Sequence, residues 1–262
     1  MAALLVLGIV VGCGPDGVVL GAPSGRPHPG GKAGDTGTAD GGGGGGSDSG
    51  GSDTSDTGGA ADDLSPETCK QVRAADAGAG DGEYTLYVGG DAASPWTAWC
   101  ADMAGSPAEY LPVDPAGGRA NYSEYAVDRG NGSTVKTVYS RLRINPRTFL
   151  VDISDQAFSS STGALDASGV QVTSMPYAVA MSCERGVYGT ANVDLGGTPF
   201  VVAADAFVVA GYEADGQATY SRSGDAVDLT GGGYCGWINP APEVYNPVND
   251  AGGFQLGLEY GG

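Results

Sequence analysis

Short apolar runs rich in valine, tyrosine and phenylalanine fill the second part of this chain of 262 residues. Glycine, proline, asparagine and aspartate separate these runs about every ten residues, which is the pattern of strands joined by turns. The sequence therefore predicts a mainly β domain with little helix. The runs are EYTLYV, TVYSRLRI, FLVDI, VQVTSMPYAVAMSC, TANVDL, PFVVAADAFVV and DAVDL.

The run at residues 135–144 has the two-residue alternation of a half-buried strand. Val138, Leu142 and Ile144 fall on one side of the alternation. The other side carries Thr137, Tyr139, Arg141 and Arg143. We therefore expect a single strand here, with its aliphatic side toward the core.

Residues 65–75 give the clearest helix signal. Ser65 is a suitable N-cap residue, and Pro66 and Glu67 suit a first helical turn. The run PFVVAADAFVVAG is apolar enough for a helix, but its β-branched residues favour a strand. We expect one short helix before the first strand.

The chain begins with an apolar run that ends in VVGC and resembles a bacterial lipoprotein signal. The run is too short to cross a bilayer, which takes roughly 20 apolar residues, but it has the length of a signal-peptide core. We expect residues 1–12 to be a signal peptide and Cys13 to be lipidated, which would anchor the protein at the cell envelope. No Lys or Arg precedes the run, so a secreted protein is the alternative.

Two further segments follow the predicted signal. Residues 13–65 are rich in Gly, Asp and Ser and have almost no large apolar side chain, so we expect a disordered, acidic tether. Residues 66–262 contain all 13 tyrosines, all three tryptophans and all five phenylalanines. This part is long enough to bury a single core.

Four cysteines lie in the domain, an even number that suits an oxidising compartment. Three pairings are possible, and we expect Cys69 to pair with Cys100 and Cys183 with Cys235. A zinc site of four thiolates is the alternative, but the close spacing of two cysteines that such sites use is missing.

Catalytic chemistry has few candidate residues. The single histidine, His28, lies in the tether, and no HExxH motif is present. Histidine-based triads and the usual zinc protease site are therefore excluded from the domain. The carboxylate pairs Asp102 with Glu109 and Asp152 with Asp155 are better read as surface or turn residues. We expect no catalytic residue.

The formal net charge of -19 argues against a nucleic-acid partner. Membrane attachment would then depend on the lipid. The acidic turns at residues 76–81 and 152–155 could bind calcium through carboxylate and carbonyl oxygens, but neither has EF-hand spacing. We expect solvated acidic loops and no cofactor, with calcium as the alternative.

Four aromatic residues lie beside the predicted disulfides and are candidate ligand-binding residues: Trp96, Trp99, Tyr234 and Trp237. If exposed, they would form a stacking face for an extracellular protein or glycan. If buried, they would pack against the sulfur atoms of the core.

Several segments together resemble the GON domain, the C-terminal module of some ADAMTS metalloproteases. The resemblance spans about residues 68–240, and its CADM and GGYCG motifs are specific as a pair. The first part is also similar to fibrinogen-like domains, but that similarity stops at Ala104, where the expected GGW is absent. The matching segments are Cys69-Lys70, Asp81 to Leu86, Cys100 to Met103, Ser106 to Tyr110, Asn121 to Ser123, Pro176 to Ala178, Gly189 to Gly197 and Gly232 to Gly236.

The resemblance implies an extracellular, disulfide-bonded, mostly β domain that in the animal proteases lies apart from the catalytic zinc domain. We therefore expect an envelope-anchored lipoprotein that displays a non-catalytic binding or adhesion module. The alternatives are a module associated with a zinc metalloendopeptidase, which would bring zinc only through the family, and an extracellular hydrolase that uses carboxylates.

Overall fold

The structure is a computed structural model, and it describes residues 65–113, 121–127, 134–167, 169–242, 245–248 and 254–262. The predicted signal at residues 1–12, the predicted lipidation site Cys13 and the tether up to residue 64 lie outside these ranges. The described part is mainly β, as predicted.

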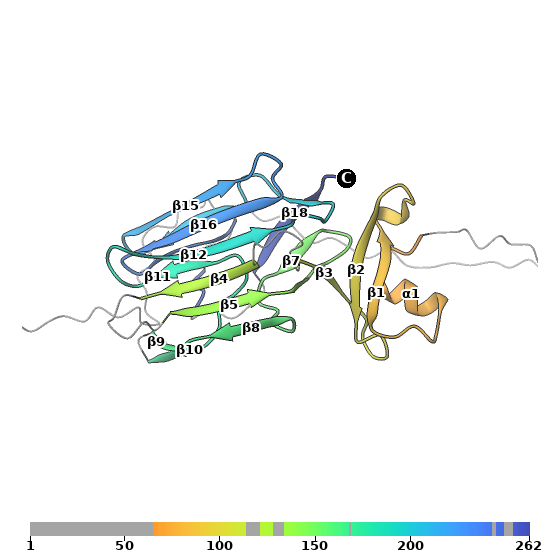
Figure 1. Cartoon of the computed structure of the whole chain (residues 1–262), viewed down its shortest axis with the longest axis horizontal. Coiled ribbons are helices and arrows are strands. Elements are labelled where there is room, and N and C mark those ends of the chain that lie inside the picture. Colours follow the sequence, from red (N-terminus) through yellow and green to blue (C-terminus); the bar gives the residue numbers. More distant parts are fainter. Residues whose placement is uncertain (1–64, 114–120, 128–133, 168, 243–244, 249–253) are drawn as a thin grey trace, which may run out of the picture. The chain divides into compact units, whose positions relative to one another are not determined.

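The strands follow one another at short intervals, with helix only near the start of the described chain (Figure 1). In chain order the elements are α1 (Cys69–Ala75), β1 (Gly82–Tyr87), the 3-10 helix η1 (Val88–Gly90), β2 (Pro95–Ala101), β3 (Ala108–Pro112), β4 (Asn121–Ala126), β5 (Val135–Tyr139), β6 (Arg141–Arg143), β7 (Leu150–Asp152), β8 (Ser159–Thr162), β9 (Leu165–Ala167), β10 (Val170–Val172), β11 (Ala180–Ser182), β12 (Val187–Asp194), β13 (Phe200–Val202), β14 (Phe207–Gly211), β15 (Ala214–Tyr220), β16 (Ala226–Gly233), β17 (Gly236–Pro240) and β18 (Gln255–Tyr260).

The strands pair into a small sheet, a large sheet and two minor ones. The small sheet has the order β1-β2-β3-β6. The large sheet follows the path β14-β17-β11-β4-β12-β16-β15, and β5 and β8 extend it beside β4. Figure 1 shows β8, β5, β4, β12, β16 and β15 in that order across the large sheet. The minor sheets are β10-β9 and β13-β18-β7.

Helix α1 was predicted at nearly its observed place, but its cap differs. Thr68, not Ser65, is the N-cap residue, and its side chain accepts a hydrogen bond from the Gln71 backbone N–H at 3.2 Å. The Gln71 side chain in turn accepts from the Thr68 N–H at 3.1 Å. This reciprocal capping box satisfies two N–H groups at the start of the helix, which explains why the helix begins at Cys69.

The expectation of one strand through residues 135–144 is wrong. The run forms β5 and β6, which belong to different sheets and are separated by Ser140. In β5 the buried side chains include Tyr139, which is 2% exposed, while Val138 is 36% exposed. In β6 the buried residue is Leu142. The passage from one sheet to the other at Ser140 therefore reverses which alternate residues face the core.

The core lies beneath the large sheet and continues to the small one. The rings of Tyr139 and Tyr177 meet edge to face with centroids 5.1 Å apart. Between the small sheet and β13, the Trp96 and Phe200 rings meet in the same way at 5.5 Å. The run PFVVAADAFVVAG forms β13 and β14, so the strand prediction for this run is confirmed.

Candidate functional site

The motifs at the start of the domain are joined to one another by specific bonds. Cys69 and Cys100 form a disulfide, as predicted. Oε1 of the buried Glu109 accepts the Cys69 N–H at 2.9 Å, which places a carboxylate at the start of α1. Oδ1 of Asp81 accepts the Met103 N–H at 2.8 Å. These residues therefore fasten α1, β1 and the turn after β2 to one another.

A second pair of motifs meets inside the core. The Tyr177 hydroxyl donates to Oδ1 of Asn121 at 2.7 Å, and both side chains are fully buried. Oδ1 of Asn121 also accepts the Asp194 N–H at 2.8 Å. The buried Ser123 hydroxyl accepts the Val179 N–H at 3.2 Å. The NYS and PYA motifs are therefore partners in one buried network of hydrogen bonds.

The GGYCG motif forms the end of β16, a turn and the start of β17. A Cβ atom on Gly232 would lie 2.4 Å from the Val187 carbonyl oxygen, and one on Gly236 would lie 2.1 Å from the Gly232 oxygen. Gly233 has a φ of +96°, which glycine adopts without strain. The motif is glycine-rich because backbone segments approach one another closely at this turn.

The carboxylates considered for catalysis organise turns. Oδ2 of Asp102 accepts the Ser106 N–H at 2.7 Å, while Glu109 serves α1 as described above. Oδ1 of Asp152 accepts the Ser154 N–H at 3.0 Å, and Asp155 bonds the Ala157 N–H in the same way at 2.9 Å. Each of these carboxylates therefore has a backbone partner that accounts for its position.

The carboxylates of the acidic turns considered for calcium also accept backbone hydrogen bonds within the fold. Oδ1 of Asp76 accepts the Gly78 N–H at 2.8 Å, and Oδ1 of Asp81 accepts the Met103 N–H. Within the ranges that the structure describes, no group of three or more His, Cys, Asp or Glu side chains is placed to hold a metal ion. Calcium binding thus stays an untested alternative.

The four predicted aromatic binding residues divide into two pairs. Trp96 and Trp237 are 3% and 8% exposed, so they lie in the core and cannot form a stacking face. Trp99 and Tyr234 are half-buried, with part of each ring at the surface. A ligand could therefore reach only the second pair.

Trp99 belongs to a cluster in which arginine side chains lie over aromatic rings. The Cζ atom of Arg141 lies 4.1 Å from the centroid of the Trp99 ring and 4.8 Å from that of Phe158. Phe158 also meets Tyr110 edge to face at 4.7 Å, and Cζ of Arg143 lies 5.4 Å from the Tyr110 centroid. We call these five residues the Arg141 cluster. Such cation and ring contacts favour a guanidinium over an ammonium group.

The strand register explains why these side chains meet. Trp99 on β2 is opposite Tyr110 on β3, and Tyr110 is opposite Arg143 on β6. Paired residues point to the same face of a sheet, and so does Arg141, two residues before Arg143. Phe158 comes from the turn before β8. The neighbouring strands β2 and β3, the strand β6 and the turn before β8 therefore form the cluster together.

The two arginines of the cluster differ in their surroundings. The Tyr110 hydroxyl donates to Oδ2 of Asp155 at 3.1 Å. Burial and then the Asp155 carboxylate raise the pKa of Tyr110, while Arg143 lowers it. Arg143 therefore lies in a group that already contains a carboxylate. Arg141, by contrast, makes no hydrogen bond or ion pair with any residue that the structure describes, and its Nε is buried without a partner.

Tyr234 also lies beside an arginine side chain, but the charge of that arginine is paired with a carboxylate. Its ring meets that of Tyr212 at 5.9 Å, and Cζ of Arg185 lies 5.4 Å from its centroid. Arg185 is paired with Glu213 at 2.6 Å, although both side chains are largely exposed. The positive charge beside Tyr234 thus has a partner, whereas that of Arg141 has none in the part of the chain that the structure describes.

Sequence reasoning found Trp99 but missed the other four residues of the cluster. The alternation in residues 135–144 already placed Arg141 and Arg143 on one side of a strand, away from the aliphatic residues. No local pattern, however, connects that side to Trp99 or to Phe158. The pairing of β3 with β6 brings Arg141 to the side of Trp99, and a hydrogen bond from the Ser140 N–H to the Phe158 carbonyl oxygen holds Phe158 beside them.

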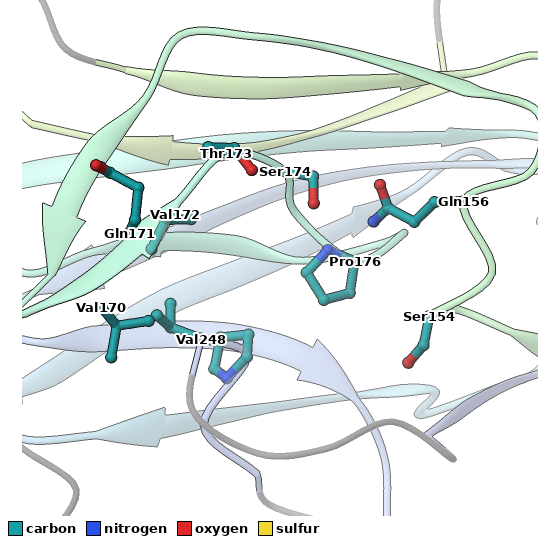
Figure 2. A pocket seen from close by; sticks show the side chains of 10 residues that line it. Ser154, Gln156, Val170, Gln171, Val172, Thr173, Ser174, Pro176 and Val248 are labelled. Atoms are coloured by element: carbon teal, nitrogen blue, oxygen red, sulfur yellow. The ribbon is translucent and has the colours of Figure 1, made fainter.

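The hollows of the surface are less suited to a ligand. One open hollow has a volume of about 280 Å³. Figure 2 shows Ser154 and Gln156 on one side of it and Val170 and Gln171 on the other. Among the residues that the structure describes, no charged side chain lines it. The amide groups of Gln156 and Gln171 donate to the carbonyl oxygens of Met175 and Leu165 at 3.0 and 2.8 Å. These polar groups are therefore used within the protein.

A second hollow, of about 530 Å³, lies between α1 and the turn after β2. Lys70 and Arg73 line it together with Met103 and Pro107. Arg73 donates to the carbonyl oxygens of Ala77 and Ala79, so it holds the loop after α1. Lys70 is exposed. No aromatic ring of the described residues lines this hollow, so it is a weaker candidate than the Arg141 cluster.

The predicted pairing of Cys183 with Cys235 has a different outcome from that of the first pair. The Cys235 sulfur lies 3.9 Å from the Cys183 carbonyl oxygen, so the two residues are neighbours. The structure does not join their sulfur atoms, and it places the Cys183 thiol against the Tyr125 hydroxyl. Burial raises the pKa of this thiol. The second disulfide therefore stays a prediction.

Fold and site together define a mainly β module with one disulfide next to its only α-helix in the described residues, and with an arginine–aromatic cluster on its small sheet. Residues 66–246 match the family model of the GON domain. Because this match covers well over half of the chain, the protein belongs to the GON domain family. Neither the curated proteins nor the solved structures contain a match. Among the described residues, no helix has the length and apolar character needed to cross a membrane.

Proposed function

We propose that this protein is an envelope-anchored lipoprotein whose GON domain binds an extracellular glycan without converting it. Cleavage before Cys13 and lipidation would attach the chain to a membrane, and the acidic tether at residues 13–65 would hold the domain away from it. A coil of about 50 Gly- and Ser-rich residues spans roughly 35 to 45 Å. A secreted form is the alternative if Cys13 is not lipidated.

The observation that carries the binding role is the guanidinium of Arg141, which lies against the Trp99 and Phe158 rings and has no hydrogen-bond or ion-pair partner among the described residues. The family motifs are engaged in bonds within the fold, so their presence does not require a reaction. Arg141 and the rings around it combine charge, aromatic surface and partial exposure, and no described residue pairs with the charge of Arg141.

A catalytic role has less support. The sequence has one histidine, His28, which precedes the domain, and it lacks HExxH. A metalloendopeptidase of the HExxH type would need histidine ligands that the GON domain does not supply. A hydrolase that uses carboxylates would need two acidic groups beside a cleft, whereas Asp102, Asp152 and Asp155 bind turn backbone.

Mass spectrometry of the intact protein from its native membrane tests the anchor. We expect a mass that corresponds to removal of residues 1–12 and acylation of Cys13. The Cys13→Ser variant should appear unacylated and leave the membrane fraction, whereas Cys183→Ser should stay acylated. An unmodified Cys13 in the membrane fraction would rule out the lipoprotein role.

A glycan array probed with the full chain tests the binding role and the absence of catalysis together. We expect retention on a subset of glycans, and bound glycan recovered with unchanged mass. The double variant Trp99→Leu, Arg141→Met should lose that retention. Retention on no glycan, or shortened glycans after incubation, would contradict the proposed function.

A further inference from the structure

We propose that the Arg141 cluster binds the carboxylate of an acidic sugar, such as a uronic-acid residue in a polysaccharide. This inference rests on the proposed binding function and adds the chemical class of the ligand. It begins with the charge of Arg141. The Trp99 and Phe158 rings lie against the guanidinium, and its N–H groups make no hydrogen bond with described residues. A guanidinium edge with two parallel N–H groups matches a carboxylate.

The surroundings favour a ligand with one negative charge at this position. The second arginine, Arg143, is near Tyr110 and the Asp155 carboxylate, so its charge is partly balanced. The chain as a whole carries a formal charge of -19, which would repel a dense polyanion. A single carboxylate can reach Arg141 without bringing further charge close to the acidic surface.

The residues beside Trp99 favour a sugar over an acidic peptide. Glu83 on β1 is directly opposite Trp99, and Thr85 is opposite Thr97 on the same face of the small sheet. Glu83, Thr85 and Thr97 are all exposed. The threonine hydroxyls and the glutamate oxygens can bind sugar hydroxyls, whereas Glu83 would repel a second acidic side chain of a peptide.

Geometry brings these groups within the span of one or two sugar rings. Neighbouring strands lie about 5 Å apart, so Glu83 is one strand from Trp99, over whose ring Arg141 lies. The half-buried Trp99 ring adds an apolar surface for sugar C–H groups. The face therefore offers a cation at one side, a ring in the middle and hydroxyl-binding groups at the other side.

Titration calorimetry of the full chain with aldotetraouronic acid, a tetrasaccharide that carries one uronic-acid residue, tests this inference. We expect Arg141→Met to weaken binding by about tenfold or more, because methionine retains packing between the rings but loses the charged N–H groups. Arg222→Met is the matched control, since Arg222 is exposed on the turn after β15 and outside the cluster. This control should change the affinity by less than about twofold.

Further measurements distinguish recognition of the carboxylate from nonspecific electrostatic or hydrophobic binding. The methyl ester of the same tetramer, which is neutral, should bind about tenfold more weakly than the acid. Arg141→Lys retains the charge and should recover only part of the affinity, because it lacks the planar pair of N–H groups. Equal binding of ester and acid, or stronger binding of heparin than of the tetramer, would overturn the inference.

The outcome also separates this inference from the proposed function. If the chain retains neutral glycans on the array and Arg141→Met binds them as the parent does, the binding function stands and the acidic-sugar assignment fails. If the chain binds no glycan, both fail. A thermal melt of each variant should agree with that of the parent, and Arg141→Lys serves as the test if Arg141→Met does not fold.

Discussion

Single buried polar residues hold this domain together at points where its motifs meet. Asn121 is the clearest case, because its fully buried amide is satisfied on every side. Its Nδ2 donates to the carbonyl oxygens of Val113 and Asp194 at 3.0 and 2.9 Å, and its Oδ1 accepts from Tyr177 and from the Asp194 N–H. A buried network of this kind stabilises one arrangement of strands because any other leaves its groups unpaired.

We therefore predict that Asn121→Ala lowers the free energy of unfolding by about 3 to 5 kcal/mol, because it leaves buried partners without hydrogen bonds. Urea denaturation measures the change. Gln217→Ala is the control, since Gln217 is exposed on β15, and it should change the stability by less than about 0.5 kcal/mol. A loss for Asn121→Ala no larger than that of the control would show that the network does not stabilise the fold.

At the scale of elements, glycines decide how closely the strands of the large sheet approach. A Cβ atom on Gly189 of β12 would lie 2.4 Å from the Met181 carbonyl oxygen. One on Gly231 of β16 would lie 2.4 Å from the Ala180 oxygen and 2.7 Å from the Ile238 nitrogen. Strands β11 and β17 thus pass over β12 and β16 at a distance that only glycine allows.

Gly231→Ala should lower the free energy of unfolding by about 3 kcal/mol or more, because the atoms that its Cβ would meet include backbone that cannot move aside. Gly80→Ala is the matched control, since a Cβ there meets nothing within 4 Å. We expect the control to stay within about 0.5 kcal/mol of the parent in urea denaturation. Similar melting of the two variants would contradict the close packing.

The disulfide between α1 and β2 is a second feature that stabilises the arrangement of the elements. It joins residues separated by 31 positions, so replacing both cysteines should cost about 3 to 4 kcal/mol by the chain-entropy model. The Cys69→Ala, Cys100→Ala variant can be compared with the parent in urea. If reductant destabilises this double variant further, another disulfide is present, as predicted for Cys183 and Cys235.

The elements also show where local patterns are sufficient and where they are not. The strand-rich pattern, the short helix and the Cys69–Cys100 pair follow from residues close together in the sequence, and the structure confirms all three. The single strand through Ser140 was wrong because alternation is read along one chain segment. A change of sheet at Ser140 leaves no local mark, although it decides whether Val138 or Tyr139 is buried.

For the molecule as a whole, the buried tyrosines make the free energy of unfolding fall at alkaline pH. Burial raises the pKa of Tyr139 above its ordinary value of about 10, and it does the same for Tyr177 and Tyr245. The folded state therefore holds these protons more tightly than the unfolded state. Their contribution to stability is fully present below pH 10, and it is lost as the pH rises above that value.

We predict that the free energy of unfolding falls above about pH 10, by about 1.4 kcal/mol per pH unit for each buried tyrosine. Urea denaturation between pH 8 and pH 11, together with phenolate absorbance, measures this. Tyr139→Phe should reduce the slope, while Tyr212→Phe, at a ring that is 57% exposed, should leave it unchanged. Ionisation of every tyrosine near pH 10 before unfolding would contradict the prediction.

The mainly β class, the family and the first disulfide could be predicted from the sequence, because they depend on local alternation, turn residues and short motifs. The tertiary structure decided which aromatic residues are buried and how the Arg141 cluster forms. Trp99, Arg141 and Phe158 come from β2, β6 and the turn before β8, and no local pattern links them. They meet because β3 pairs with both β2 and β6, and such long-range pairing depends on packing across the whole domain.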